Sequence, residues 1–105
     1  GQFDFGNLVV VVVSNPKDIV RIPLSEQVLS AGAVCAALVN AAQAVGFGGC
    51  WLSGWLSHDS DFIQSAFGLS AHETVAGLVH LGTPKQKSPE TIRPETTNIT
   101  QWMTE

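Results

Sequence analysis

The sequence is short of charge, because only 13% of its 105 residues are Asp, Glu, Lys or Arg, against about 25% in an ordinary soluble domain. A length of 105 residues accommodates one small domain. Such a domain exposes a large surface, and too few charges to cover it indicate that another chain covers part of it. We therefore expect a single domain that forms an oligomer.

Basic residues are scarcer than acidic ones, five against nine, which gives a formal net charge of −4. This is the wrong sign for holding a phosphate backbone, so we expect no nucleic-acid partner. No uninterrupted apolar run reaches the roughly 18 to 20 residues of a membrane span, and no basic flank of a signal peptide precedes an apolar segment. We expect a soluble, cytoplasmic protein with no membrane partner.

Cysteine is also scarce. Cys35 and Cys50 form no CxxC pair and have no histidine beside them, so the sequence predicts neither a disulfide framework nor a zinc site. We interpret both as small, buried apolar residues.

Two segments read as β-strands. Residues 8–13 contain five consecutive valines and end at the turn-forming residues 14–18, which predicts a strand buried on both faces. The other convincing strand is 74–81. Two strands do not form an independently stable sheet, so we expect further strands from a segment outside this chain or from a second subunit.

A long helix is predicted from Leu24 to Val45, with Pro23 in its first turn, Glu26 near the positive end of its dipole and Gly46 as its stop. Twelve of residues 31–45 are apolar and seven of these are alanine. A helix without a polar face is expected to be buried all round, with small residues that allow close approach of a neighbouring backbone. We place it at the centre of the fold, at a subunit interface.

A second, shorter helix follows, capped by Asp59, with Asp61 in its first turn and Gly68 at its end. Its apolar stripe consists of Phe62, Ile63, Ala66 and Phe67. Residues 1–83 therefore form the core, and the proline-containing residues 84–105 form an extended arm. Trp102 in this arm is either a disordered tail residue or an anchor that docks on a partner chain, and its size favours docking.

The segment 46–55 combines four glycines, two tryptophans and Ser53. Aromatic walls and accessible backbone N–H groups suit a flat aromatic ligand. The alternative is a helix end followed by a short buried strand, 50–52. The phosphate-loop patterns GxGxxG and GxxxxGK[ST] are absent, so no Rossmann or P-loop site is predicted.

No catalytic or metal-binding constellation is evident. The three histidines lack the spacing of metal ligands, and we interpret His80 as a hydrogen-bonded core residue. Asp59 and Asp61 are better explained by helix capping than by a catalytic pair. The serines have no histidine placed to activate them, and GxSxG does not occur. A small basic group, consisting of Lys85, Lys87 and Arg93, either meets a phosphate or belongs to a solvated arm.

Taken together, five motifs resemble the C-terminal half of a small nitroreductase. They are Val11-Val12-Val13-Ser14-Asn15-Pro16-Lys17, Ile22-Pro23 with Glu26-Gln27, Leu29 to Ala33, Gly46-Phe47-Gly48 through Trp51-Leu52-Ser53-Gly54-Trp55, and Ala76 to Pro84. They occur in order and at matching spacings over residues 7–94.

The resemblance implies an α+β fold, the C-terminal portion of the nitroreductase fold, with a long central helix, a small sheet and an intertwined dimer that exchanges its C-terminal arms. It implies FMN as cofactor, NAD(P)H as reductant and a nitroaromatic or quinone-like small molecule as acceptor, with the chemistry carried by the cofactor. By position, the flavin contacts are Trp51, Leu52, Ser53 and Gly54, with Lys85 reaching the phosphate. The nicotinamide side is Ala41, Ala42, Gln43, Ala44, Val45 and Gly46. No residue is assigned a catalytic or metal-binding role.

Two departures from the family pattern qualify these expectations. The family's N-terminal segment, with its Arg-Arg-Ser type phosphate motif, has no counterpart here, and Ser25 stands where an aromatic residue often occurs. We expect a truncated product, a proteolytic remnant or one half of a split protein, which would pair with a second copy or a complementing N-terminal half. Weak FMN binding follows from the missing phosphate contacts. The alternatives are a non-enzymatic flavin-binding or dimerisation module and a plain structural protein.

Overall fold

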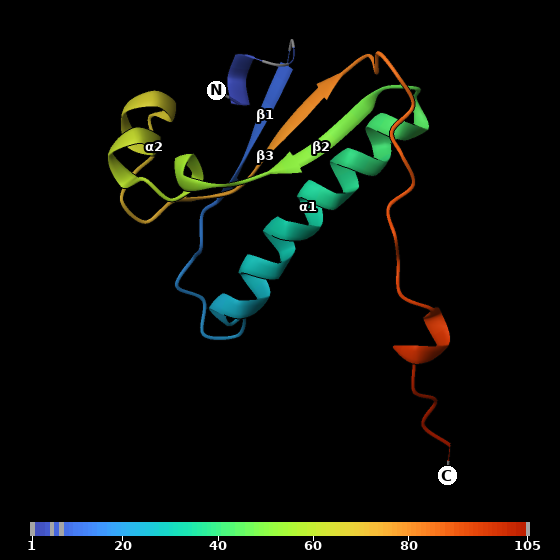
Figure 1. Ribbon diagram of the computed structural model, residues 1–105. Coiled ribbons are helices and arrows are strands. Elements are labelled where there is room, and N and C mark those ends of the chain that lie inside the picture. The colour runs from blue at the N-terminus through green and yellow to red at the C-terminus, as the bar shows by residue number, and fades with distance from the viewer. Residues whose placement is uncertain (1, 5, 7, 105) are drawn as a thin grey trace.

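The computed structural model describes residues 2–4, 6 and 8–104, and it has an α+β architecture as predicted (Figure 1). The elements in chain order are η1 (Gln2–Asp4), β1 (Leu8–Ser14), α1 (Leu24–Ala44), β2 (Gly48–Leu52), η2 (Trp55–Ser57), α2 (Ser60–Phe67), β3 (Thr74–Gly82) and η3 (Thr96–Asn98). Both predicted helices and both predicted strands are present, with ends within two residues of those expected. Pro23 is the N-cap of α1 and therefore precedes its first turn, in which it was expected.

The three strands form an antiparallel sheet in the order β1-β3-β2. β1 lies at an edge of the sheet and, within residues 8–104, pairs with β3 alone. The expectation that the valine strand is buried on both faces is wrong for this chain, because its side chains are mostly half-buried, whereas Leu78 and Val79 of the central β3 are fully buried. The third strand comes from β2, which is the short strand considered as the alternative for residues 50–52.

One face of the sheet is covered by α1, which runs alongside β2 and β3 (Figure 1) and also contacts β1. The core on this face is built from Val12, Cys35 and Val79. Small residues bring the two layers together: a methyl group on Gly49 would lie 3.5 Å from both the Ala42 Cβ atom and the Val39 Cα atom. The expected close approach of a neighbouring backbone to the alanine-rich helix is therefore found at β2.

The expectation that α1 is buried all round is wrong within this chain. Cys35 and Ala42 are its buried residues, whereas large apolar side chains face outward. These are Leu24, Val28, Leu29 and Val34, each at least 51% exposed. We call these four residues the outer face of α1. These side chains are exposed because, among the described residues, the sheet covers one side of the helix only.

By length and composition, the 21 residues of α1 could also cross a membrane, a result that the uninterrupted-run criterion did not predict. Core helices of soluble proteins pass the same test, so one such helix is weak evidence for a span.

The opposite face of the sheet is covered by α2 and η2, around a core of Ile63, Val75 and Leu78. The predicted cap is confirmed: the Asp59 carboxylate accepts a hydrogen bond of 2.8 Å from the backbone N–H of Phe62. Gly68 ends α2 in the left-handed conformation with φ 67°. An aromatic group lies over this face, in which the Phe62 ring is 5.5 Å from Phe67 and 6.4 Å from Phe3.

The loop between β1 and α1 is held by one amide side chain. Gln27 accepts a hydrogen bond of 2.7 Å from the backbone N–H of Lys17, and its Nε2 donates to the carbonyls of Lys17 and Ile22 at 2.9 and 3.0 Å. The C-terminal arm is different, since residues 84–104 are exposed and run away from the sheet (Figure 1). Trp102 is 84% exposed and does not anchor the arm to its own core.

Candidate functional site

Trp51, the first of the proposed flavin contacts, lies between the sheet and α1. Its indole N–H donates a hydrogen bond of 3.2 Å to the carbonyl of Ala76 on β3. The ring passes directly over Gly77, and its far edge lies 3.6 Å from where a methyl group on Gly32 of α1 would be. The ring is therefore packed within the fold on one side, although 44% of the residue remains exposed.

Leu52, Ser53 and Gly54 follow at the end of β2, and all three are exposed. Gly54 has φ 91° and ψ −170°, and there is open space where its side chain would be. This conformation favours glycine and turns the chain from β2 into η2. The result is a short stretch of accessible backbone at one end of β2.

Lys85 lies beyond the opposite end of β2, because Gly48 at the start of that strand pairs with Gly82 at the end of β3. There it lines a cavity of about 650 Å³ together with the backbone of Gly48 and Gly49 and the side chain of Ser88. The structure does not bring Lys85 next to Ser53. The five residues of β2 lie between the two positions, and in extended conformation they span about 17 Å.

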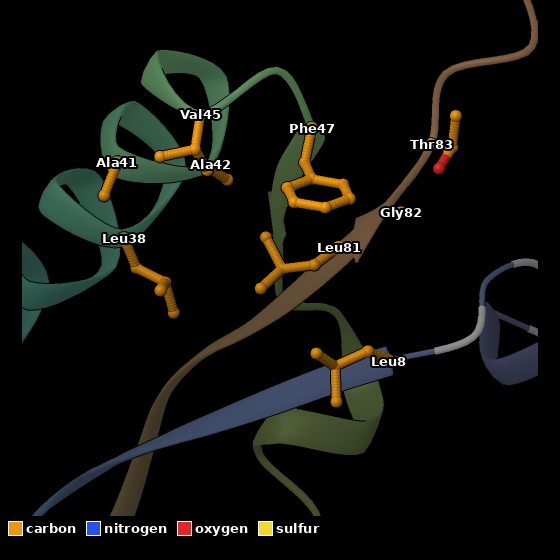
Figure 2. Close-up of a pocket in the computed structure, with 9 residues that line it drawn as sticks. All are labelled: Leu8, Leu38, Ala41, Ala42, Val45, Phe47, Leu81, Gly82 and Thr83. Atoms are coloured by element: carbon orange, nitrogen blue, oxygen red, sulfur yellow. The ribbon is translucent and has the colours of Figure 1, made fainter.

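The residues assigned to the nicotinamide side fall into two groups. Ala41, Ala42 and Val45 line a cavity of about 550 Å³ between the end of α1 and the edge of the sheet, whereas Gln43, Ala44 and Gly46 do not line it. The remaining lining residues are Leu8, Leu38, Phe47, Leu81, Gly82 and Thr83. Figure 2 shows the side chains of Leu38, Phe47 and Leu81 gathered in the space between the helix and the strands. The lining is apolar apart from Thr83, so this cavity suits an aromatic ring.

Sequence reasoning missed Phe47 as a lining residue, although its place between two glycines after a helix was a usable signal. Leu8 and Thr83 could not have been found in this way, because the sheet brings them to α1 from distant parts of the chain.

The two cysteines differ in environment. Cys35 is fully buried against Trp51 and Val79, and this burial raises the pKa of its thiol. The expectation that Cys50 is buried is wrong, since it is exposed. Side chains alternate along a strand, so Cys50 faces away from α1 on the edge strand β2, where it borders the cavity near Lys85.

His80 is half-buried, and one of its ring nitrogens does not fit the interpretation of a hydrogen-bonded core residue. Its Nε2 atom is buried and has no hydrogen-bond partner among the described residues. The Phe3 ring stacks on the imidazole at 6.1 Å, and an aromatic neighbour offers no ordinary acceptor or donor. Within the described part of the chain, no group of three or more His, Cys, Asp or Glu side chains is placed to hold a metal ion.

Comparison with known proteins identifies relatives of this chain. "Putative NAD(P)H nitroreductase YdjA" of Escherichia coli (strain K12) is 38% identical over 85 residues, covering 81% of this chain and 46% of that protein. "Putative NAD(P)H nitroreductase" of Haemophilus influenzae is 37% identical over 84 residues, covering 79% and 45%. The chain therefore spans about half the length of these curated relatives.

A crystal structure of a nitroreductase-like family protein from Bacillus cereus superposes with a TM-score of 0.74 at 24% identity, covering 90% of this chain and 50% of that chain. At this identity the superposition shows the fold. The sequence profile of the Nitroreductase family matches residues 7–83, which include all three strands and both α-helices. The chain belongs to the nitroreductase family.

Proposed function

We propose that this chain forms part of an FMN-dependent oxidoreductase that passes hydride from NAD(P)H to a nitroaromatic or quinone-like acceptor. The observation that carries the proposal is the arrangement along β2. Accessible backbone at Leu52–Gly54 lies at one end of this strand, and the ammonium group of Lys85 belongs to the cavity at the other end. Family membership and the names of the relatives support the oxidoreductase class.

The residues present fit an elongated, planar ligand with a charged end. Within the described residues, β2 pairs on one edge only, so its other edge offers unpaired N–H and C=O groups. A flat ring system would lie at Leu52, Ser53 and Gly54, where the backbone is open. A phosphate would be met by Lys85 in a charge-assisted contact.

When bound, FMN supplies the redox chemistry by accepting hydride from NAD(P)H and releasing it to the acceptor. The task of the chain's own residues is to bind and orient. The apolar cavity lined by Ala41, Ala42 and Phe47 would exclude water around a nicotinamide or acceptor ring.

The outer face of α1 supports a homodimer as the working assembly. Its four apolar side chains, and those of Ile19, Val20 and Ile22 beside the helix start, are each at least 43% exposed, and exposed apolar side chains that lie together mark interaction sites. A second copy of the chain, or a complementing segment of nitroreductase type, would cover this surface. We place the assembly in the cytoplasm, without a nucleic-acid or membrane partner.

The experiment that tests the cofactor is a titration of the 105-residue protein with FMN, followed by absorbance in the flavin bands. We expect weak binding, in the micromolar range or above, because Lys85 is the one Lys or Arg among the described residues that line its cavity, and the acidic residue Asp4 lines it too. A parallel titration with riboflavin, which lacks the phosphate, distinguishes binding of the ring from binding of the phosphate. Lys85→Ala should weaken FMN binding about tenfold and leave riboflavin binding unchanged.

The matched control is Lys87→Ala, two residues along the same arm and not among the residues that line this cavity, which should change neither affinity. No flavin binding at any concentration would contradict the proposal, and tight, sub-micromolar retention would contradict the expectation of weak binding. Flavin binding without oxidation of NAD(P)H in the presence of a quinone would favour the alternative function, a non-enzymatic flavin-binding or dimerisation module.

A further inference from the structure

Three features of the fold converge on the indole of Trp51. The first is steric. A methyl group on Gly77 would overlap the indole Nε1 atom and lie 2.9 Å from the Cys35 Sγ atom. Real Cβ atoms do not approach other atoms so closely, so the ring occupies the place that a side chain at position 77 would need.

The second feature is a β-bulge in the pairing of β1 with β3. Val12 pairs with Gly77 and Val13 pairs with Val75, so the register passes over Ala76. A bulge leaves its extra residue without a regular ladder partner. The carbonyl of this residue, Ala76, accepts the hydrogen bond from the Trp51 indole.

The third feature is the position of Trp51 in the chain. It immediately precedes Leu52, Ser53 and Gly54, the accessible stretch to which the proposed function assigns the flavin ring. Leu52 is the last residue of β2 to pair with β3, opposite Leu78, and the chain then turns at Gly54. Among the described residues, 53 and 54 have no partner in the sheet, so on their N-terminal side they are held through Leu52 and the Trp51 ring just before it.

We propose that Trp51 is a positioning residue: its indole, seated over Gly77 and bonded to the bulge carbonyl of Ala76, fixes the backbone of residues 52–54 for the cofactor. Its indole N–H group donates to a carbonyl of this chain and is therefore not free to bind the ligand. The flavin is then met by the backbone that follows Trp51, and the indole does not act as a stacking platform. This inference rests on the proposed function for its ligand, but its structural part can be tested without flavin.

The first test uses the protein without flavin, labelled with ¹⁵N. The three tryptophans give three indole N–H signals, of which Trp55 and Trp102 are matched controls at 69% and 84% exposure. We expect hydrogen exchange of the Trp51 indole to be at least about tenfold slower than that of the other two. Trp51→Phe, which keeps a ring and removes the N–H donor, should increase the backbone mobility of residues 52–54 measured by ¹⁵N relaxation.

Gly77→Ala should release the Trp51 indole and mobilise residues 52–54 more strongly. Its matched control is Gly82→Ala on the same strand, because a methyl group there meets no atom within 4 Å. If Gly77→Ala does not fold, Trp51→Phe still decides the question. Equal exchange of the three indoles, or unchanged relaxation of residues 52–54 in Trp51→Phe, would overturn the inference.

The second test adds FMN. Trp51→Phe should weaken FMN binding about fivefold and change the visible circular dichroism of the bound flavin, which reports its orientation, whereas Trp55→Phe should change neither. If the unaltered protein binds no flavin, the proposed function fails, and the relaxation measurements still judge the role of Trp51. If it binds flavin and Trp51→Phe leaves both readouts unchanged, the positioning role fails while the proposed function stands.

Discussion

The two α-helices cover opposite faces of one sheet, but they differ in how well residues of this chain cap and bury them. The eight residues of α2 are capped at both ends, by the Asp59 carboxylate and by Gly68, and Ile63 is buried in the core beneath them. The twenty-one residues of α1 have no side-chain hydrogen bond at their N-cap, and Cys35 and Ala42 are their buried residues. The short helix α2 is capped and packed by residues of this chain. The long helix α1 packs on one side and exposes apolar side chains elsewhere.

This difference shows that apolar content alone does not reveal where a helix is buried. In α2 an apolar stripe and a polar remainder distinguish the core side from the solvent side. In α1 the exposed and the buried side chains are both largely apolar, which is what the proposed homodimer would require of a helix with a second packing surface. Substitutions on α2 should therefore act on the stability of the single chain, and substitutions on the outer face of α1 should act on association.

The largest effect on stability is expected at the buried centre of α2. Ile63→Ala should lower the free energy of unfolding by about 2–4 kcal/mol, because it leaves a cavity against Val75 and Leu78. Urea unfolding at two protein concentrations measures this loss, which should not depend on concentration. Leu29→Ala, at a position that is 73% exposed on α1, is the comparison and should cost about 0.5 kcal/mol or less in dilute protein. Equal losses of unfolding free energy at the two positions would contradict the inference that α2 is buried by this chain and that Leu29 of α1 is not.

The next effect concerns association through the outer face of α1. Leu29→Asp should weaken self-association by at least about tenfold, because a charge would have to be desolvated in the interface. Sedimentation velocity over a range of concentrations measures this change. Ile92→Asp, the same kind of change at a 98% exposed residue of the arm, is the matched control and should leave association unaltered. A monomer at all concentrations in the unaltered protein would contradict the homodimer.

A smaller effect is expected from the cap of α2. Asp59→Ala removes the acceptor for the Phe62 N–H and should cost about 1 kcal/mol of stability, measured by thermal or urea unfolding. Asp59→Asn keeps a side-chain oxygen acceptor and should retain most of that stability. A similar loss in both variants would show that the charge near the helix end matters more than the capping hydrogen bond.

The smallest effect should appear as a dependence on pH. The backbone N–H of Ser70, which donates to Glu73 at 2.9 Å, and then the Ser70 side chain hold the pKa of the Glu73 carboxyl below its ordinary value of 4.5. A lowered pKa in the folded state stabilises the protein above the unfolded pKa. That contribution is lost as the pH falls below about 4.5 and through the folded value.

Glu73→Gln should therefore flatten the pH dependence of stability in this acidic range, as measured by urea unfolding at a series of pH values. Glu90→Gln, at an exposed position of the arm, should leave that dependence unchanged. An identical acid dependence in Glu73→Gln and the unaltered protein would contradict the assignment.

Local signals were sufficient to predict most of the fold. The valine run fixed β1, and Asp59 and Gly68 marked both ends of α2, because strand preference and helix capping depend on residues close in sequence. The order of the strands was not predictable in this way. Placing β3 at the centre depends on pairs of residues far apart in the chain, such as Leu52 with Leu78 and Leu8 with Leu81, and this placement left β1 at an edge.

Prediction of the candidate site was less complete. The glycine and tryptophan segment was identified as important from composition, but the place of the Trp51 ring depends on the bulge at Ala76 and on Gly77, which the chain brings beside it from another strand. The exposure of Cys50 follows from its alternation with Trp51 on an edge strand. The assignments of Lys85 to a phosphate and of 41–46 to a nicotinamide stay predictions.

The amide of Gln27 has a consequence for how the protein can meet a partner. By holding Lys17 and Ile22 with three hydrogen bonds, it keeps the exposed apolar residues Ile19 and Val20 in a fixed arrangement before any encounter. Ordering a loop at the moment of association weakens binding, and a loop already held in place avoids most of that loss. One neutral side chain thus gives a charge-poor protein a rigid apolar contact surface whose shape should be insensitive to salt.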